Sequence, residues 1–140
     1  MIHFRLVSQS GVKFDNDAYE IILPTLDGQI GVLKDHMPLV SVVSNGVIKI
    51  RVNPRDSDQK MELFATNGGV IEVSNNQLNV LVDEADHADS INEAEAQAAY
   101  EKALKLKEEA EDEISLENAQ KLIDRHAVRL QVANLRRRHH

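Results

Sequence analysis

Leu78-Asn-Val-Leu-Val-Asp83 is the last stretch of this sequence in which apolar and polar residues alternate. Val47-Ile-Lys-Ile-Arg-Val52 has the same period of two, which places the apolar side chains on one face of a β-strand. Beyond Asp86 there is no Gly or Pro, and Ala, Glu, Lys, Leu and Arg recur at the spacing of a helix with one buried stripe. The change of period near residue 85 predicts a β domain, residues 1–85, followed by a helical arm, residues 86–140.

Short strands bounded by turn residues fill the β domain. Turn signals such as Asn45-Gly46 and Asn67-Gly-Gly69 separate them, and no helical pattern intervenes. Such strands predict an all-β sandwich or barrel of about nine or ten antiparallel strands, and nothing in the pattern indicates a parallel pair. The expected strands are residues 2–8, 11–15, 18–24, 29–33, 39–43, 46–52, 59–66, 69–74 and 77–83.

The arm is predicted to be an antiparallel hairpin of two helices. Ser90 and Glu93 have the spacing of a capping box, and Ser115 offers a second helix start. One continuous helix over residues 91–136 is the alternative, and the acidic run 108–113 is expected to be a turn and a solvated face. The expected apolar stripes are Ala96, Ala99, Ala103, Leu106 and Ala110, then Leu116, Ala119, Ile123, Ala127 (or His126), Leu130 and Ala133. Because Ala buries few carbons, we expect this hairpin to detach easily from the β domain.

Composition narrows the functional classes. The formal net charge of -7 argues against a nucleic-acid partner, and the absence of Cys excludes disulfides, thiolate metal sites and a cysteine nucleophile. No signal peptide and no apolar run of about 20 residues is present, so we expect a soluble protein that stays where it is made. His139 and His140 are open to two interpretations, native residues or the remnant of a purification tag.

No group of residues has a catalytic pattern. No nucleophile elbow surrounds any Ser, and His3, His87 and His126 share no metal-ligand spacing with His36. Gly28-Gln-Ile-Gly31 lacks the third glycine and the following helix of a phosphate loop, so it predicts a hairpin. We therefore expect a protein that is not an enzyme and has no catalytic residues and no metal ligands.

The last helix is basic although the protein is acidic. Lys121, Arg125, Arg129 and Arg136-Arg-Arg138 lie with a single acid, Asp124. Two explanations are open. The cations offset the helix dipole near its C-terminus, or they dock on an acidic partner.

Four segments, in this order, resemble the epsilon subunit of F-type ATP synthases. They are Gly28-Gln-Ile-Gly-Val-Leu-Lys-Asp-His-Met-Pro-Leu39, Asn45-Gly-Val-Ile-Lys-Ile50, Asn67-Gly-Gly-Val-Ile-Glu-Val73 and Val80-Leu-Val-Asp83. The resemblance implies a non-catalytic central-stalk subunit that binds the gamma subunit and the ring of c subunits. It also implies that the helices restrain ATP hydrolysis, either folded on the sandwich or extended towards the alpha and beta subunits.

The implied location is peripheral, on the cytoplasmic face of the bacterial plasma membrane or the stromal face of a thylakoid membrane, without insertion into the bilayer. A stand-alone β-sandwich adaptor with a helical docking arm is the alternative. Co-purification with the gamma subunit and the catalytic hexamer separates the two.

The resemblance also assigns roles to single residues. Gln29 and His36 would lie in a turn that faces the c-ring. The arginines Arg125, Arg129, Arg136, Arg137 and Arg138 would dock the arm on the catalytic subunits.

Some bacterial members bind ATP through an Ile/Leu-Asp-x-x-Arg-Ala motif at the start of the first helix. Ile91 and Ala96 match it here, as do Arg125 and Arg129 on the second helix, whereas Asn92 and Glu95 replace the Asp and the Arg. A Glu beside a polyphosphate repels it by about 4 kcal/mol for unit charges about 4 Å apart at an effective dielectric constant of about 20. ATP is thus expected to be a weak regulatory ligand at most, and no other cofactor is expected.

Overall fold

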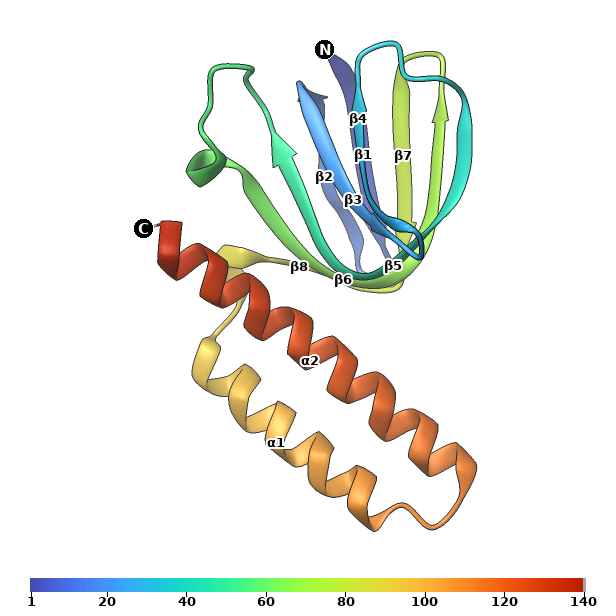
Figure 1. The fold of residues 1–140 in the computed structure, drawn as a ribbon, viewed down its shortest axis with the longest axis vertical. Coiled ribbons are helices and arrows are strands. Elements are labelled where there is room, and N and C mark those ends of the chain that lie inside the picture. The colour runs from blue at the N-terminus through green and yellow to red at the C-terminus, as the bar shows by residue number, and fades with distance from the viewer. Residues whose placement is uncertain (140) are drawn as a thin grey trace.

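The structure, a computed structural model, describes residues 1–139. His140 and the side chain of His139, whose origin was left open above, lie outside the described residues. The chain folds into an eight-stranded β-sandwich followed by two antiparallel helices, which confirms the predicted fold class (Figure 1). The strands are β1 (Ile2–Ser8), β2 (Gly11–Ala18), β3 (Glu20–Thr25), β4 (Gly28–Leu33), β5 (Leu39–Arg51), β6 (Glu62–Ser74), β7 (Gln77–Val82) and β8 (Ala85–His87).

Two long strands build both layers of the sandwich. The strand order is β2-β1-β7-β6-β5-β3-β4, and β8 pairs with β6. The second half of β6 pairs with β7, whereas its first half pairs with β8. The second half of β5 pairs with β3, and β5 and β6 pair with each other along nearly their whole length. Each long strand therefore begins in one layer and ends in the other.

The predicted turns at Asn45-Gly46 and Asn67-Gly-Gly69 are bends inside these strands, so this part of the prediction was wrong. Val43 pairs with Gly69 and Asn45 with Asn67, in an unbroken antiparallel register. Four predicted strands thus merge into two, and β8 was not predicted. Glycine is required because a Cβ at residue 69 would overlap the backbone of Leu81, and one at residue 46 would lie 2.8 Å from Cβ of Pro24.

One pair of strands is parallel, contrary to the sequence prediction. β1 runs parallel to β7, from His3 opposite Gln77 to Val7 opposite Leu81. The period of two shows which face of a strand is buried, but it carries no information on the direction of the neighbouring strand. The antiparallel pairing of the other strands was predicted correctly.

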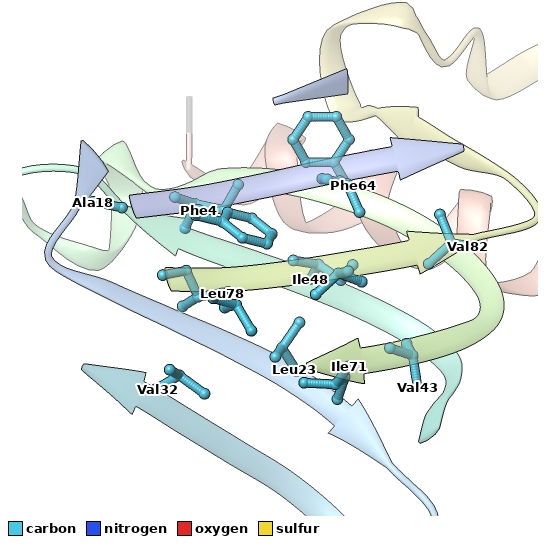
Figure 2. Close-up of a cluster of buried hydrophobic side chains, with 14 of the residues drawn as sticks. Phe4, Ala18, Leu23, Val32, Val43, Ile48, Phe64, Ile71, Leu78 and Val82 are labelled. Carbon is cyan, nitrogen blue, oxygen red and sulfur yellow. The ribbon is translucent and has the colours of Figure 1, made fainter. Parts of the chain in front are cut away.

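The interior between the two layers is apolar and fully buried. Phe4, Ile48, Phe64, Ile71 and Leu78 are among its largest side chains, and they come from β1, β5, β6 and β7 (Figure 2). Their positions in the alternating stretches are those that the sequence pattern predicts.

The helices are α1 (Glu93–Glu109) and α2 (Glu113–His139), so the continuous helix is excluded. The predicted caps were wrong. Ser90 ends a short 3-10 helix, η2 (Ala88–Ser90), and Asn92 caps α1 by accepting a hydrogen bond from the amide of Glu95 at 3.0 Å. Asp112 accepts a bond from the amide of Ser115 at 2.7 Å, which lowers the pKa of the Asp112 carboxyl. Asn and Asp accept bonds from the free amides of a helix start as well as Ser does.

Helix α2 lies against the sandwich, and α1 packs mainly on α2 (Figure 1). Val128 and Val132 of α2 contact Val47, Leu63 and Ala65 on the outer face of β5 and β6. Among the buried residues of this apolar cluster, only Ala96 and Ala133 come from the predicted stripes. Ala103, Ala119 and Ile123 are buried outside it, whereas Leu106, Leu116 and Ala127 are exposed. The contact with the sandwich therefore uses larger side chains than the sequence indicated, and easy detachment stays a prediction.

The predicted boundary between residues 85 and 86 falls inside β8. The edge of the His87 ring meets the ring of Phe64, with the centroids 5.0 Å apart. A chain that ends at Ser90 keeps β8 and this ring contact, so it is the better definition of the sandwich for truncation.

The bend at Gly69 yields a prediction about stability. Gly69→Ala should destabilise the protein by about 1–3 kcal/mol or more, because the added methyl group overlaps the backbone of β7. Gly31→Ala is the matched control: its Cβ would lie 3.7 Å from the Glu20 carboxylate, an ordinary contact, so a change within about 0.5 kcal/mol is expected. Urea unfolding of the full chain measures both. Equal midpoints for the two variants would contradict the role given to Gly69.

Candidate functional site

The connection between the sandwich and α1 is acidic and is held firmly to the sheet. It carries Glu84, Asp86, Asp89 and Glu93, which we call the acidic connector. The amide of Glu84 donates a hydrogen bond to Oδ1 of Asn67 at 3.0 Å, and the carbonyl of Glu84 accepts one from the Thr66 hydroxyl at 3.1 Å. These bonds and the pairing of β8 with β6 fix the carboxylates along the path of α2.

Four arginines of α2 pair with the four carboxylates of the acidic connector. Nη2 of Arg125 lies 3.1 Å from Oε2 of Glu84, and Nε of Arg129 lies 3.4 Å from Oδ2 of Asp86. Further along α2, Arg136 pairs with Asp89 at 3.4 Å and Arg137 with Glu93 at 3.2 Å. Arg136 also donates to the carbonyl of Ala88 at 2.9 Å. We call these four pairs the arginine latch.

The latch is least exposed to solvent at its inner end. The Arg129 side chain is 13% exposed, whereas that of Arg137 is 67% exposed. Exposed pairs contribute only about 0–1 kcal/mol each, because water and salt screen them. Arg125 and Arg129 lie one helical turn apart, as the sequence predicts, and their Nε atoms are buried without a hydrogen-bond partner among the described residues.

His126 lies between these two arginines and is buried. Its Nδ1 accepts a hydrogen bond from Nη1 of Arg129 at 3.2 Å, which places the proton of the neutral ring on Nε2. Burial, and then the positive charges of Arg129 and Arg125, lower the pKa of the imidazole. The helical spacing indicated His126 only as an alternative to Ala127 in the apolar stripe, and the structure buries His126 and leaves Ala127 exposed.

Gln29 and His36 are not brought together, so the expected turn that contains both does not exist. β4 separates them: Gln29 is exposed at its beginning, and His36 follows its end. The ring of His36 is bonded within its own loop, because Nδ1 lies 2.7 Å from the carbonyl oxygen of Met37. The same loop is tied to the β6–β7 turn by Asn76, which accepts a bond from the amide of Asp35 at 3.1 Å.

The residues aligned with the ATP motif are used here for packing, helix capping and ion pairing. Ile91 is buried in the cluster beneath α2, Ala96 is buried, Asn92 caps α1, and Glu95 is exposed. Arg125 and Arg129, which also match the family's ATP-binding residues, are paired with carboxylates of the acidic connector.

Sequence reasoning missed an apolar surface. Val42, Val70 and Leu81 lie in register on the outer face of β5, β6 and β7, and 53%, 47% and 58% of these residues are exposed. Val7 of β1, opposite Leu81, extends the row, which we call the apolar band. The signal was present in the sequence: apolar residues occupy positions that the period of two assigns to the solvent face.

Other kinds of site are not found among the described residues. No three His, Asp or Glu side chains among those that the structure describes, residues 1–138, are grouped so that they could hold a metal ion. In the same part of the chain, neither helix is both long and apolar enough to cross a membrane. An exposed apolar band of this kind is typical of a site for interaction with another protein.

The chain belongs to the family of ATP synthase epsilon chains. The family model "ATP synthase, Delta/Epsilon chain, beta-sandwich domain" matches residues 1–88. The chloroplastic ATP synthase epsilon chain of Psilotum nudum is 33% identical, over 96% of this chain and 98% of the relative. The epsilon chain of Nostoc punctiforme is 38% identical, over 71% of this chain and 70% of the relative.

Solved structures agree on the fold. A chain of the Euglena gracilis mitochondrial ATP synthase superposes with a TM-score of 0.78 at 19% identity, covering 95% of this chain and 81% of that one. The family membership confirms the predicted resemblance and the prediction of a non-catalytic subunit, and it replaces the stand-alone adaptor.

Proposed function

We propose that this epsilon chain is a rotor subunit of the central stalk of a proton-translocating F-type ATP synthase. Its sandwich binds the gamma subunit and the c-ring, and its hairpin restrains ATP hydrolysis. The solved neighbours support this, because one belongs to an assembly of the Euglena gracilis mitochondrial ATP synthase that contains the c-ring, and another to the central stalk and c-ring of the Tetrahymena thermophila enzyme. The proposed location is peripheral, at the cytoplasmic or stromal membrane face, through the assembled complex.

The apolar band is the surface that we propose binds the gamma subunit. Burying one exposed Val or Leu side chain contributes about 1.5–3 kcal/mol, so a partner that covers the band gains stability from several residues at once. The hairpin packs on Val47, Leu63 and Ala65 of β5 and β6, and so it leaves Val42, Val70 and Leu81 exposed. The sandwich can then stay bound to the stalk while the hairpin moves.

For the c-ring, we favour the end of the sandwich that carries Gln29. The adjoining turn between β3 and β4 presents Leu26, which is 83% exposed, and the Gln29 side chain is exposed beside it. The His36 ring, at the other end of β4, is bonded within its own loop. Cross-linking from a cysteine placed at residue 29 or at residue 36 distinguishes the two ends.

A charge in the apolar band tests assembly. Leu81→Glu should abolish co-purification with the gamma subunit, because a carboxylate in a dry interface loses its hydration without a partner. Ile114→Glu is the matched control, since Ile114 is an equally apolar residue that is 73% exposed near the tip of the hairpin. We expect the control to assemble normally. Normal assembly of the Leu81 variant, with its fold verified by circular dichroism, would show that the stalk binds another face.

We further propose that the latch arginines have two alternative sets of partners. In the folded hairpin they pair with the acidic connector. In the extended hairpin the same arginines, with Arg138, meet acidic segments of the alpha and beta subunits and restrain hydrolysis. Because the folded arginines are already paired, docking exchanges one set of ion pairs for another, so the free-energy difference between the two states is small.

Removing the arginines tests the docking role. Replacing Arg125, Arg129, Arg136, Arg137 and Arg138 with Ala removes both sets of pairs, so ATP hydrolysis by the assembled complex should rise by the amount by which the docking pairs outweigh the connector pairs, at most about tenfold for exposed pairs of about 0.2–1 kcal/mol each. The increase should be clearest at low salt. A chain that ends at Ser90 gives the rate without any hairpin. An unchanged rate at normal epsilon occupancy would show that apolar contacts hold the restraining state.

The opposite change supplies the control. Glu84→Gln together with Asp86→Asn weakens the folded latch but leaves the arginines free for docking. This variant should lower hydrolysis, whereas a variant that only destabilises the hairpin would raise it. The sign of the change therefore separates electrostatic docking from loss of helical structure.

We propose that ATP is not a tight ligand of this chain. Glu95 stands where the family motif has an Arg, and the two matching arginines are paired with Glu84 and Asp86. Calorimetric titration of the full chain with ATP should give no binding in the micromolar range. Glu95→Arg together with Asn92→Asp should strengthen binding, and micromolar affinity of the unmodified chain would overturn the proposal.

A further inference from the structure

One imidazole, His126, lies buried among the arginines of the latch, and a second, His87, lies in the acidic connector, where its Nδ1 is 3.7 Å from Oδ2 of Asp89 and its Nε2 is 3.4 Å from Oε2 of Glu62. His126 lies on α2 in the seam that faces the acidic connector and is 9% exposed. The charged groups that act on its ring come from every element packed around it: Arg125 and Arg129 from α2, Asp86 from β8 and Glu95 from α1. Burial, and then the two arginines, which outweigh the two carboxylates at the ring, lower the pKa of the imidazole.

The carboxylates nearest to this ring are already paired with arginines, so they are not available to stabilise a protonated imidazole. Asp86 pairs with Arg129 at 3.4 Å and lies 4.0 Å from Arg125, and Glu84 pairs with Arg125 at 3.1 Å. Glu95 is exposed, so water screens its charge. A proton on His126 would add a third cation to one turn of α2, and it would also remove the lone pair that accepts the bond from Arg129.

We propose that His126 makes the arginine latch sensitive to pH, so that acidification releases the hairpin from the sandwich. In a detached hairpin the ring regains its hydration, which removes the largest cause of the lowered pKa, so the pKa rises towards the ordinary value of about 6.5 although Arg125 and Arg129 remain beside it on the same helix. As the pH falls below that value, the detached form binds a proton and the folded form does not. The stabilisation of the folded form is therefore complete above about pH 6.5 and is lost as the pH falls through the lowered pKa.

If the hairpin restrains hydrolysis as proposed above, its release in acid should strengthen that restraint. Only this consequence rests on the proposed function. The movement of the hairpin is a property of the isolated chain and is tested there. The sequence has no Cys, so a single pair of fluorescent labels can be placed at Arg55→Cys on the sandwich and Glu111→Cys near the tip of the hairpin, both exposed positions. Loss of energy transfer between the labels then measures detachment.

The ratio of detached to folded hairpin should rise by up to about tenfold per pH unit between about pH 6.5 and the lowered pKa. His126→Gln keeps an acceptor for Arg129 but does not titrate, so its ratio should stay flat over the same range. His3→Gln is the matched control. The pKa of His3 is raised by hydrogen bonds to Asp17 and Asp15 on β2, so its loss should leave the response of the hairpin unchanged.

A second measurement keeps the inference testable if His126→Gln does not fold. Nuclear magnetic resonance titration of the unmodified chain should give a pKa for His126 below about 6.5. An ordinary or raised pKa, a flat response of the unmodified chain, or an equal response in the His126→Gln variant would each overturn the proposal. Hydrolysis assays of the assembled complex are run separately. If the hairpin responds and hydrolysis does not, the switch holds and the proposed restraint fails.

Discussion

The passage of β5 and β6 through both layers is the constraint on which the rest of the structure depends. Because each strand has 13 residues and bends at its glycines, the same two strands supply the interior, the apolar band and the surface beneath α2. Val43 and Ile71 point into the sandwich, Val42 and Val70 lie on the outer face of one layer, and Val47 and Leu63 contact the hairpin from the other. The surface left for a partner and the surface used by the hairpin are thus carried on one rigid pair of strands.

This arrangement separates assembly from regulation in physical terms. The apolar band depends only on the sheet, whose pairing does not involve either helix. The hairpin depends on a small apolar contact and on the latch, whose ion pairs range from nearly buried to exposed. For a buried ion pair, the free energy lost by removing both charges from water is about as large as the Coulomb energy gained. Pairs of this kind therefore define a geometry more than they add stability. The hairpin is placed in one position without being bound strongly to it.

Much of the fold could be predicted because it follows from local periodicity. The period of side-chain alternation changes near residue 85, and no helical pattern comes before it. These two features predicted the sandwich and the hairpin. The direction of β1 beside β7 could not be predicted, since side-chain alternation is the same in parallel and antiparallel strands. The bends at Gly46 and Gly69 were mistaken for turns because glycine next to Asn has the composition of a turn, whereas its reason here is the close approach of Pro24 and Leu81.

The candidate site was predictable only in part, for a similar reason. The common face of Arg125 and Arg129 follows from helical spacing, but their partners lie about 40 residues earlier, in a segment whose acids look like those of any solvated loop. The helical spacing indicated His126 only as an alternative member of the apolar stripe, and its position between two cations could not be predicted, because it depends on burial in the fold.

The charge distribution connects these observations. In the folded hairpin the four latch arginines and the four connector carboxylates cancel locally, so the seam has almost no net charge. Extension would expose a strongly basic helix end and a strongly acidic connector at once, on a chain whose formal net charge is unchanged at -7. The two states therefore differ in the field they present to neighbouring subunits more than in their number of ion pairs, and that difference is what a charged partner can select. A neutral His126 belongs to the cancelled state, because a proton on its ring would add a third cation beside Arg125 and Arg129.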